Sequence, residues 1–501
     1  MSSTLKTAAA ALSTFLWIAT ALPAQEVAAP EPSASGNAEA AQGAPAAHGY
    51  SKVRIVRISE TKGAENGGVQ LDRNTGRGFE DAITNLPIVE GCSLRTGTGV
   101  AEVEFEDNST LRLAPGTLVK FTQLELLPSG GKLSTMNVAR GMVYASLAPT
   151  RGNEFTLTFG QQKLQLEPSS HVRLNVEQTK AVLGVFDGTV QVESPAGTTE
   201  VGRKKTLTIP LDGQSQPVVA RNVKPEDFDS WDHDSAEYHH QFASMSAVAN
   251  SPYSYGVSDL MYYGSFINAG GCGQMWQPYF VSAAWSPFTN GTWAWYPGAG
   301  YSWVSPYPWG WMPFHYGSWA FCQGTGWGWQ PGGQWSGLTN AATVVSPRSP
   351  TFRGPHPPLE TPLEGGSTMV RVNVKPLPAS ALLSSEKFVF RNDSAGLGVP
   401  RGSLGRLDRF SERAARRGSA STAVYSDHPM AEAGGGQPRN AGPASAGMMA
   451  AAPTLHRGYA PPSEPMGPSL PAGMAGMTSG ANSSMSGGSS ARVATGGGRP
   501  R

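Results

Sequence analysis

The stretch AEVEFEDNSTLRL, residues 101–113, alternates apolar and polar side chains on both sides of Asp107-Asn108-Ser109. An alternation with a period of two places successive side chains on opposite faces of a β-strand. Asp, Asn and Ser favour tight turns because their short side chains hydrogen-bond to the nearby backbone. The stretch therefore predicts two strands joined by a turn, each with one buried face and one face in water.

The same alternation recurs in the segments 52–58, 155–159, 171–176 and 182–192. In the last segment, Asp187-Gly188 separates two apolar runs, a pattern that predicts a hairpin. Helical periodicity is not evident between these segments. We therefore expect an all-β domain over residues 50–215, long enough to bury one core.

Residues 1–24 have the layout of a secretory signal peptide, with Lys6, an apolar run over 8–22 and small residues before a cleavage site. A membrane anchor is the alternative, but the run is shorter than the ~20 residues that a span needs. We expect cleavage, export to the periplasm or beyond, and no transmembrane segment in the mature chain. Residues 25–49, rich in Ala and Pro, predict a flexible linker.

The β-pattern resembles the FecR domain of bacterial envelope proteins. The residues that carry the resemblance are Gly91, Leu94, Thr96-Gly97, Ala101, Val103, Phe105, Asp107, Ser109, Leu111, Leu113, Pro115, Thr117, Gly141, Val143 and the run 186–190. The best-known members place a cytoplasmic anti-sigma segment and one transmembrane helix before this domain. Here a signal peptide precedes it, so the resemblance implies an envelope β-domain for binding or scaffolding, without a transmembrane relay.

Residues 251–336 form a region rich in Trp, Gly and Pro. One tetrapeptide occurs three times, as YGSF at 263–266, NGTW at 290–293 and YGSW at 316–319, and Trp276, Trp303 and Trp329 each follow ten residues after its last aromatic. This fixed spacing indicates an internal repeat, and the Gly-rich turns predict one short hairpin per copy. The run resembles a Trp/Tyr/Gly/Pro-rich segment of unknown function that is often found beside FecR-like domains.

Three roles for these aromatic rings are open. They form the core of a small repeat module, or some of them face solvent and stack on a neutral glycan such as peptidoglycan, or they stack on nucleic-acid bases. Nucleic acid is disfavoured, because no Lys or Arg lies between residues 253 and 335 to neutralise phosphates. For the glycan hypothesis, the ligand-facing candidates are Trp285, Trp303 and Trp311.

Two cysteines of this region, Cys272 and Cys322, are a candidate disulfide, since an exported protein meets an oxidising environment. Cys92, inside the β-pattern, is expected to be a buried apolar side chain.

Residues 220–250 predict a helical connector. It contains the densest titratable cluster of the chain, at 232–234 and 239–240, which is either a metal site or a solvated helix face; its spacing matches no defined metal motif, so we assign no metal. Residues 337–501 are rich in Pro, Gly, Ser and Ala and predict a mostly disordered tail, with strands at 368–374 and 387–390 and a basic helix at 407–417 as candidates to dock.

The sequence therefore predicts a mainly β protein with a FecR-like domain, a β-hairpin repeat module and a disordered tail. We expect no enzymatic activity and no cofactor, because catalytic and cofactor-binding motifs are not evident. The preferred function is a periplasmic or secreted binding or scaffold protein, whose partner is a neutral glycan or another envelope protein and not nucleic acid. The alternatives are a carbohydrate-binding protein and a signalling component that acts in trans with a membrane partner.

Overall fold

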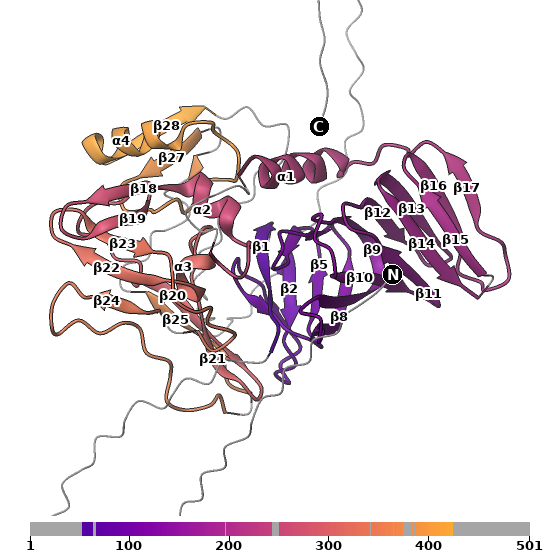
Figure 1. The fold of residues 1–501 in the computed structure, drawn as a ribbon, viewed down its shortest axis with the longest axis horizontal. Helices are drawn as coiled ribbons and strands as arrows, with labels where there is room; N and C mark the ends of the chain where they lie inside the picture. The colour runs from indigo at the N-terminus through magenta and orange to yellow at the C-terminus, as the bar shows by residue number, and fades with distance from the viewer. Residues whose placement is uncertain are drawn as a thin grey trace, which may run out of the picture. The chain divides into compact units, whose positions relative to one another are not determined.

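A computed structural model describes residues 53–63, 67–195, 197–242, 250–340, 342–363, 365–373, 383–384 and 387–423. The described chain is mainly β, which confirms the predicted fold class (Figure 1). The predicted signal peptide, the linker and the tail beyond residue 423 lie outside the described residues.

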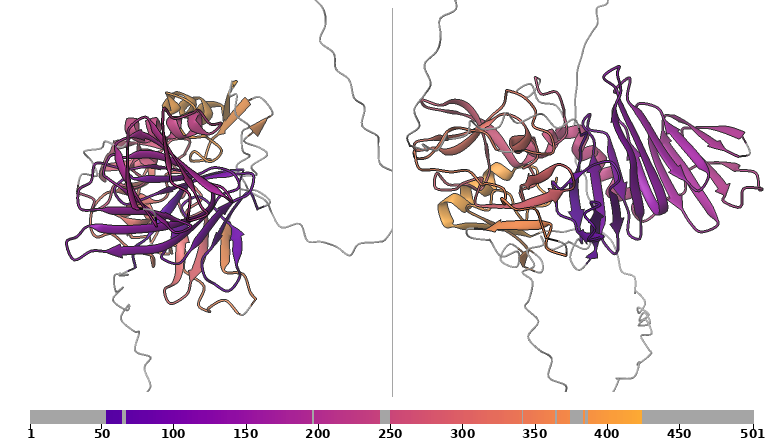
Figure 2. Two further views of the ribbon diagram at one scale, coloured as in Figure 1. Left: turned by 90° about the vertical axis from the view of Figure 1, so that its right-hand side faces the viewer. Right: turned by 90° about the horizontal axis from the view of Figure 1, so that it is seen from below.

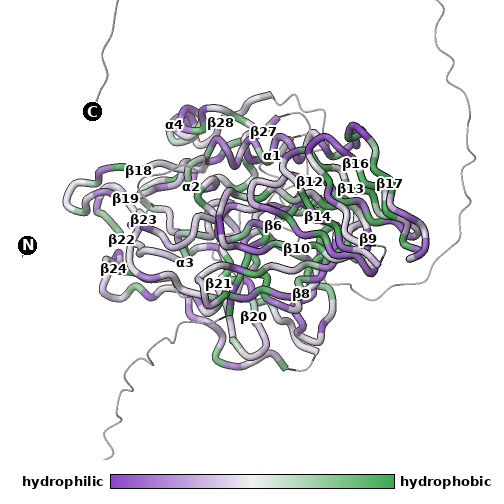
Figure 3. The backbone as a smooth tube through the Cα atoms, turned by 45° about the vertical axis from the view of Figure 1, so that its right-hand side comes forward, coloured by the Kyte–Doolittle hydropathy of each residue, from purple (hydrophilic) through white to green (hydrophobic). Residues whose placement is uncertain are grey.

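In the described part of residues 56–221, called here the β-domain, seventeen strands hydrogen-bond into one continuous sheet system and lie side by side (Figure 2). They are β1 (Val56–Lys62), β2 (Val69–Asp72), β3 (Phe79–Asp81), β4 (Pro87–Ile88), β5 (Ser93–Thr96), β6 (Val100–Glu104), β7 (Thr110–Leu113), β8 (Leu118–Leu126), β9 (Lys132–Ser146), β10 (Glu154–Phe159), β11 (Gln162–Leu166), β12 (His171–Val176), β13 (Lys180–Asp187), β14 (Thr189–Ser194), β15 (Gly197–Gly202), β16 (Lys205–Pro210) and β17 (Val218–Arg221). Hydrophobic stretches recur along these strands and supply the core (Figure 3).

Strand β9 belongs to both halves of this sheet system. Its first part pairs with β8 and β10, and from Gly141 onward it pairs with β7 and β12. Gly141 has a φ of 89°, and a side chain there would collide with Thr117. The glycine is therefore required where the strand changes partners, because only glycine adopts this conformation at such close approach without strain.

The Asp187-Gly188 turn is not a hairpin, and this prediction was wrong. β13 pairs with β12 and β16, whereas β14 pairs with β11 and β15. Gly188 has a φ of 80° and packs against Ser170, so the turn passes the chain from one ladder to the other. Asp-Gly chemistry specified a tight reversal but not which strands would pair across it. By contrast, β6 and β7 do pair around Asp107-Asn108-Ser109, as predicted.

Two helices follow the β-domain, α1 (Asp229–Phe242) and α2 (Val257–Tyr263). α1 lies within the predicted connector, whereas α2, which begins the repeat region, was not predicted.

Three hairpins then coincide with the three tetrapeptides. Their strands are β18 (Gly264–Ala269) with β19 (Gly273–Pro278), β20 (Asn290–Tyr296) with β21 (Gly300–Val304), and β22 (Ser318–Cys322) with β23 (Gly326–Gln330); the short helix α3 (Met312–His315) precedes the third. We call residues 251–336 the aromatic module. Its first and third hairpins share one sheet through the pairing of Trp276 with Trp329.

Described segments between residues 342 and 423 also pack against the aromatic module, which was predicted to end at residue 336. Their elements are β24 (Val344–Ser346), β25 (Met369–Asn373), β26 (Leu383–Ser384), β27 (Lys387–Arg391), α4 (Leu407–Arg417) and β28 (Ser419–Ala423). β25 extends the second hairpin, and β24 pairs with β22. The predicted strands near 368–374 and 387–390 and the helix at 407–417 are therefore present.

Candidate functional site

Charged side chains from distant parts of the chain meet where β1, β6 and β7 contact α1 and α2. We call this set the buried charge network, and every member is almost fully shielded from water. Its members are Arg57, Glu102, Glu104, Arg112, Asp232, His239, Asp259 and Arg401.

Strand β6 supplies two carboxylates of the network, Glu102 and Glu104. Their alternation with Ala101 and Val103 predicted a face in water, but all five residues of β6 are buried. Because α1 and α2 cover the polar face of the strand, its carboxylates must find partners inside the protein.

One half of the network is centred on Arg57. Its guanidinium donates to Glu104 Oε2 at 2.7 Å through Nε and to Asn85 Oδ1 at 2.9 Å, and a terminal nitrogen also donates to Asp259. Asp259 accepts a further hydrogen bond from Arg401, at 2.8 Å, and one from the Tyr238 hydroxyl, at 2.9 Å. Burial alone would raise the pKa of Asp259, but Arg401 and Arg57 outweigh it and lower that pKa.

The other half of the network is centred on Glu102. One oxygen accepts from His239 Nε2 at 2.8 Å, Arg401 at 2.7 Å and the Ser59 hydroxyl at 2.6 Å. The second oxygen accepts from Arg112 at 2.7 Å, and Arg112 also reaches Asp232 at 2.8 Å. Although burial opposes it, the charges of His239, Arg112 and Arg401 hold the pKa of Glu102 well below its usual range.

This arrangement of buried ion pairs holds the strands and helices that supply its members together. Each carboxylate lies in an ion pair with at least one arginine, and hydrogen bonds connect the polar atoms that face inward. Within the described part of the chain, no group of three or more His, Cys, Asp or Glu side chains is arranged to hold a metal ion. Of the cluster that raised the metal hypothesis, Asp232 and His239 are network members, whereas His233, Asp234 and His240 are exposed.

The repeated spacing of the aromatic module has a direct structural basis. The last aromatic of each tetrapeptide faces the Trp ten residues later across its hairpin, in the pairs Phe266–Trp276, Trp293–Trp303 and Trp319–Trp329. The tetrapeptide glycine lies beneath that Trp: a methyl group at Gly264 or Gly291 would overlap the indole ring of Trp276 or Trp303. The motif therefore requires a glycine, because the indole ring of the Trp across the hairpin packs directly on the position where a side chain would lie.

The three Trp residues predicted to face a ligand are in the core, which corrects that prediction. Trp285, Trp303 and Trp311 are 5%, 2% and 1% exposed. Trp285 packs on Tyr307 and Trp309, and Trp303 on Trp293. The reason is energetic, because aromatic side chains bury the largest apolar area, and a module of short hairpins needs them inside.

Two family models match the chain. Residues 93–191 match the model described as FecR protein. The chain carries a FecR domain. Residues 257–349 match a family of unknown function, designated DUF6600, in the order that the sequence predicted. Glu102, Glu104 and Arg112 lie in the first match and Asp259 in the second, so the buried charge network joins the two matched regions.

Comparisons with individual proteins add little. Two solved structures, each described as a putative anti-sigma factor from Parabacteroides distasonis, are similar at 14% and 15% identity, with TM-scores of 0.23 and 0.21. The matches cover 26% and 24% of this chain and only 59% and 55% of those chains. No curated protein matches the chain. Among the described residues, no helix combines the length and apolar character needed to cross a membrane.

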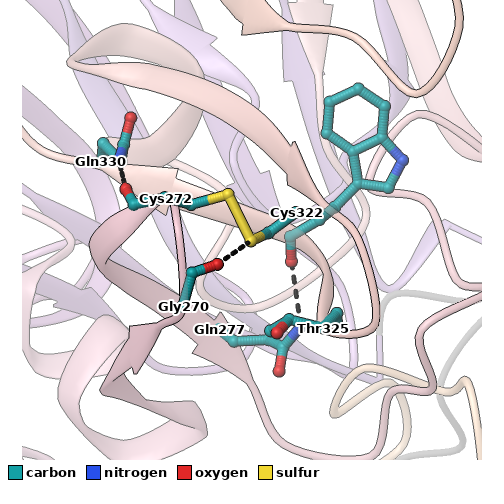
Figure 4. Close-up of a disulfide and its surroundings, with 7 residues drawn as sticks. Gly270, Cys272, Gln277, Cys322, Thr325 and Gln330 are labelled. Carbon is teal, nitrogen blue, oxygen red and sulfur yellow. Dashed lines mark hydrogen bonds between the residues drawn. A yellow bond between two sulfur atoms is a disulfide. The ribbon is translucent and has the colours of Figure 1, made fainter.

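Cys272 and Cys322 form a disulfide between the first and third hairpins (Figure 4). Their Cα atoms are 6.1 Å apart, and the bond spans 50 residues of chain. Side-chain amides hydrogen-bond to the backbone near the disulfide: Gln330 donates to the Cys272 carbonyl at 2.9 Å, and Gln277 donates to the Thr325 carbonyl at 3.0 Å. The remaining cysteine, Cys92, is buried in the core of the β-domain, and burial raises the pKa of its thiol to about 11.

His315 occupies the centre of the aromatic module as a neutral ring. It is stacked between Trp311 and Trp335, its Nδ1 donates to the Ser336 carbonyl at 3.1 Å, and its Nε2 faces the Asn340 amide nitrogen at 3.4 Å. A second ring proton would point at that amide donor. Burial lowers the pKa of His315 to about 4, so this histidine has a structural role at neutral pH.

Proposed function

We propose that the protein is an exported, non-enzymatic scaffold of the bacterial cell envelope, in which the FecR domain and the aromatic module act as one rigid binding unit. The observation that carries the proposal is the buried charge network, because it contains residues of both family matches. Removing one partner of a buried ion pair costs about 3–5 kcal/mol, so the two regions resist separation.

The state of the titratable groups supports a non-enzymatic role. A general acid or base must exchange protons near neutral pH and must reach a substrate. In the network, the pKa values of Glu102 and Asp259 are lowered, and both side chains are fully buried beneath their cationic partners. The role of these two carboxylates is therefore to form buried ion pairs that stabilise the fold.

Export is supported by the N-terminal layout and by the disulfide. A bond between Cys272 and Cys322 persists in oxidising compartments such as the periplasm and is reduced in a bacterial cytosol. A scaffold that works outside the cytoplasm gains stability from such a bond at the site where it acts.

The test is fractionation of a bacterial host that expresses the full chain with a C-terminal tag. We expect the tagged protein in the periplasm or medium, with a mass that corresponds to removal of about 24 residues at a small-residue cleavage site. A variant lacking residues 2–24 is the matched control and should remain in the cytoplasm with Cys272 and Cys322 as free, reduced thiols. Retention of the full chain in the cytoplasm with an intact N-terminus would refute export.

A second candidate function, binding of cell-wall carbohydrate, is favoured by one observation. Trp295 and Tyr301 are half-buried and line a groove of about 640 Å³, unlike the three buried Trp residues that were predicted for this task. In this form the scaffold has a glycan as its partner.

A further inference from the structure

A groove opens beside the second hairpin of the aromatic module. Its lining combines Trp295 and Tyr301 of the hairpin, above the buried Trp293, with residues of the segment 339–344 and the Pro-rich segment 354–361. Its volume of about 640 Å³ lies within the ~300–1,000 Å³ usual for ligand pockets. The groove is therefore large enough for a short oligomeric ligand.

Strand alternation explains why the wall supplied by the hairpin is aromatic. Ala294 and Tyr296 point to one face of β20 and join the core of the FecR domain. Trp293 and Trp295 point to the other face, where Trp293 is buried in the module core and Trp295 is half-buried at the tip. Trp295 lies directly across from Tyr301 in the hairpin, so the two rings form adjacent platforms.

Hydrogen bonds hold the backbone of the aromatic wall in place. The Trp295 carbonyl accepts a hydrogen bond from Arg73 of the β-domain, and the Trp295 amide donates to the Thr368 carbonyl at 2.8 Å. Arg73 is itself buried and also hydrogen-bonds Glu80 and the Thr368 hydroxyl. A platform fixed in this way loses little conformational entropy on binding.

The polar groups at the groove have unused hydrogen-bonding capacity. Among the described residues, none accepts from the Trp295 indole N–H or pairs with the Tyr301 hydroxyl or the Glu360 carboxylate. The described lining contains no Lys or Arg. This lining disfavours a polyanion, and its flat rings and polar rim groups fit a ligand that presents apolar faces to the rings and hydroxyl groups to the rim.

The geometry points to an uncharged oligosaccharide as the ligand of the Trp295–Tyr301 groove. Sugar rings have apolar C–H faces that stack on aromatic rings and equatorial hydroxyls that donate to a carboxylate or accept from an indole N–H. An anionic polymer would meet the Glu360 carboxylate in a lining that has His356 but no Lys or Arg, and a purely apolar ligand would leave the rim groups unpaired. The prolines of segment 354–361 belong to the lining, so binding of a Pro-rich peptide in place of sugar is an opposing outcome of the test.

The test is calorimetric titration of the exported full chain with two uncharged series, N-acetylglucosamine oligomers and β-linked glucose oligomers, and sedimentation with purified peptidoglycan. We expect affinity to rise with oligomer length up to the length of the groove. Trp295→Ala should weaken binding at least about tenfold, as removal of a central aromatic contact does. Tyr301→Phe, which keeps the ring and removes the hydroxyl, should weaken it less. The two oligomer series and the sedimentation identify the sugar source.

Two controls make the result decisive. Tyr279→Ala removes a half-buried tyrosine of the same module that does not line the groove, and it should leave affinity unchanged. Trp295→Phe retains an aromatic platform if the alanine variant unfolds, as judged by thermal melting. Absence of binding to every sugar, or binding indifferent to both Trp295 and Tyr301, would overturn the inference. So would Trp295-dependent binding of a peptide with the sequence of residues 354–361 in place of sugars.

This inference rests on the proposed envelope role, yet the two fail separately. A cytoplasmic location in the fractionation experiment would reject the scaffold role even if sugars bind in vitro. Exported protein that binds no sugar would reject only the groove's ligand.

Discussion

Replacement of Asp259 by Asn tests whether the buried charge network joins the FecR domain to the aromatic module. The substitution keeps the size of the side chain and its hydrogen bond from Tyr238, but removes the negative charge that Arg57 and Arg401 share. Each guanidinium keeps one carboxylate, Glu104 or Glu102, and loses the other. All of these side chains are at most 8% exposed, so water cannot take the place of the lost charge.

The expected loss is therefore that of a broken buried pair, about 3–5 kcal/mol of the free energy of unfolding. Urea unfolding should be followed by tryptophan fluorescence, which reports mainly on the aromatic module, and by far-UV circular dichroism, which is dominated by the sheet of the FecR domain. Because the network contains residues of both, the two transitions should shift together.

Asp408→Asn is the matched control. Asp408 pairs with Arg406 at 3.0 Å, but both side chains are largely exposed, and water screens such a pair. This control should unfold at nearly the same urea concentration as the unmodified protein. A loss of less than about 1 kcal/mol in Asp259→Asn, or a shift confined to one of the two signals, would refute the reasoning that the network couples the two regions.

Three further predictions concern the aromatic module. Gly291→Ala should destabilise the folded protein by about 1–3 kcal/mol, because the added methyl group overlaps the Trp303 ring. Gly270→Ala is the control, since its methyl group meets open space and should cost little. Thermal melting compares the two variants, and equal losses of stability would contradict the proposed basis of the motif. Acid should destabilise the folded chain through His315. In the unfolded chain this ring binds a proton as the pH falls through about 6.5, whereas in the folded chain its pKa is about 4 and it stays neutral. Its contribution to the free energy of unfolding is therefore complete above pH 6.5, and about 2 kcal/mol of it is lost by pH 5. The free energy of unfolding in urea should fall less between pH 6.5 and pH 5 in His315→Gln than in the unmodified protein, and an equal fall in both would reject this role. Paired substitution of Cys272 and Cys322 by Ser should cost about 4 kcal/mol, the loop-closure value for a 50-residue loop, and thiol titration of the oxidised, unfolded protein should detect only Cys92.

The strands and hairpins were largely predictable because their signals are local. Alternation over 101–113 and the ten-residue spacing after each tetrapeptide specify which residues pair across a turn. What covers a strand is not a local property. The Glu102 side chain was expected in water, and its burial depends on His239 and on Arg401, which follow it by 137 and 299 residues.

The aromatic rings show the same limit in another form. Period-two alternation places Trp293 and Trp295 on one face of β20, but it does not tell how far the core extends along that face. The core ends between them, so Trp293 is buried and Trp295 borders the groove. The residues chosen from the sequence, Trp285, Trp303 and Trp311, are all buried in the core. The rest of the groove lining comes largely from residues 339–344 and 354–361, which the sequence assigned to the tail.

Arg401 gives that tail a structural role. It is the cation that bridges Glu102 of the FecR domain to Asp259 of the aromatic module, with distances of 2.7 Å and 2.8 Å. Without it, Glu102 keeps Arg112 and His239, and Asp259 keeps Arg57, but no single cation then contacts both carboxylates. Because a buried carboxylate that loses a cation is costly, the network is complete only when residues 57 to 401 are folded together. The folded unit therefore contains the FecR domain, the aromatic module and the docked part of the tail, and the Trp295 backbone is tied to the β-domain through Arg73 and to the tail through the pairing of β20 with β25.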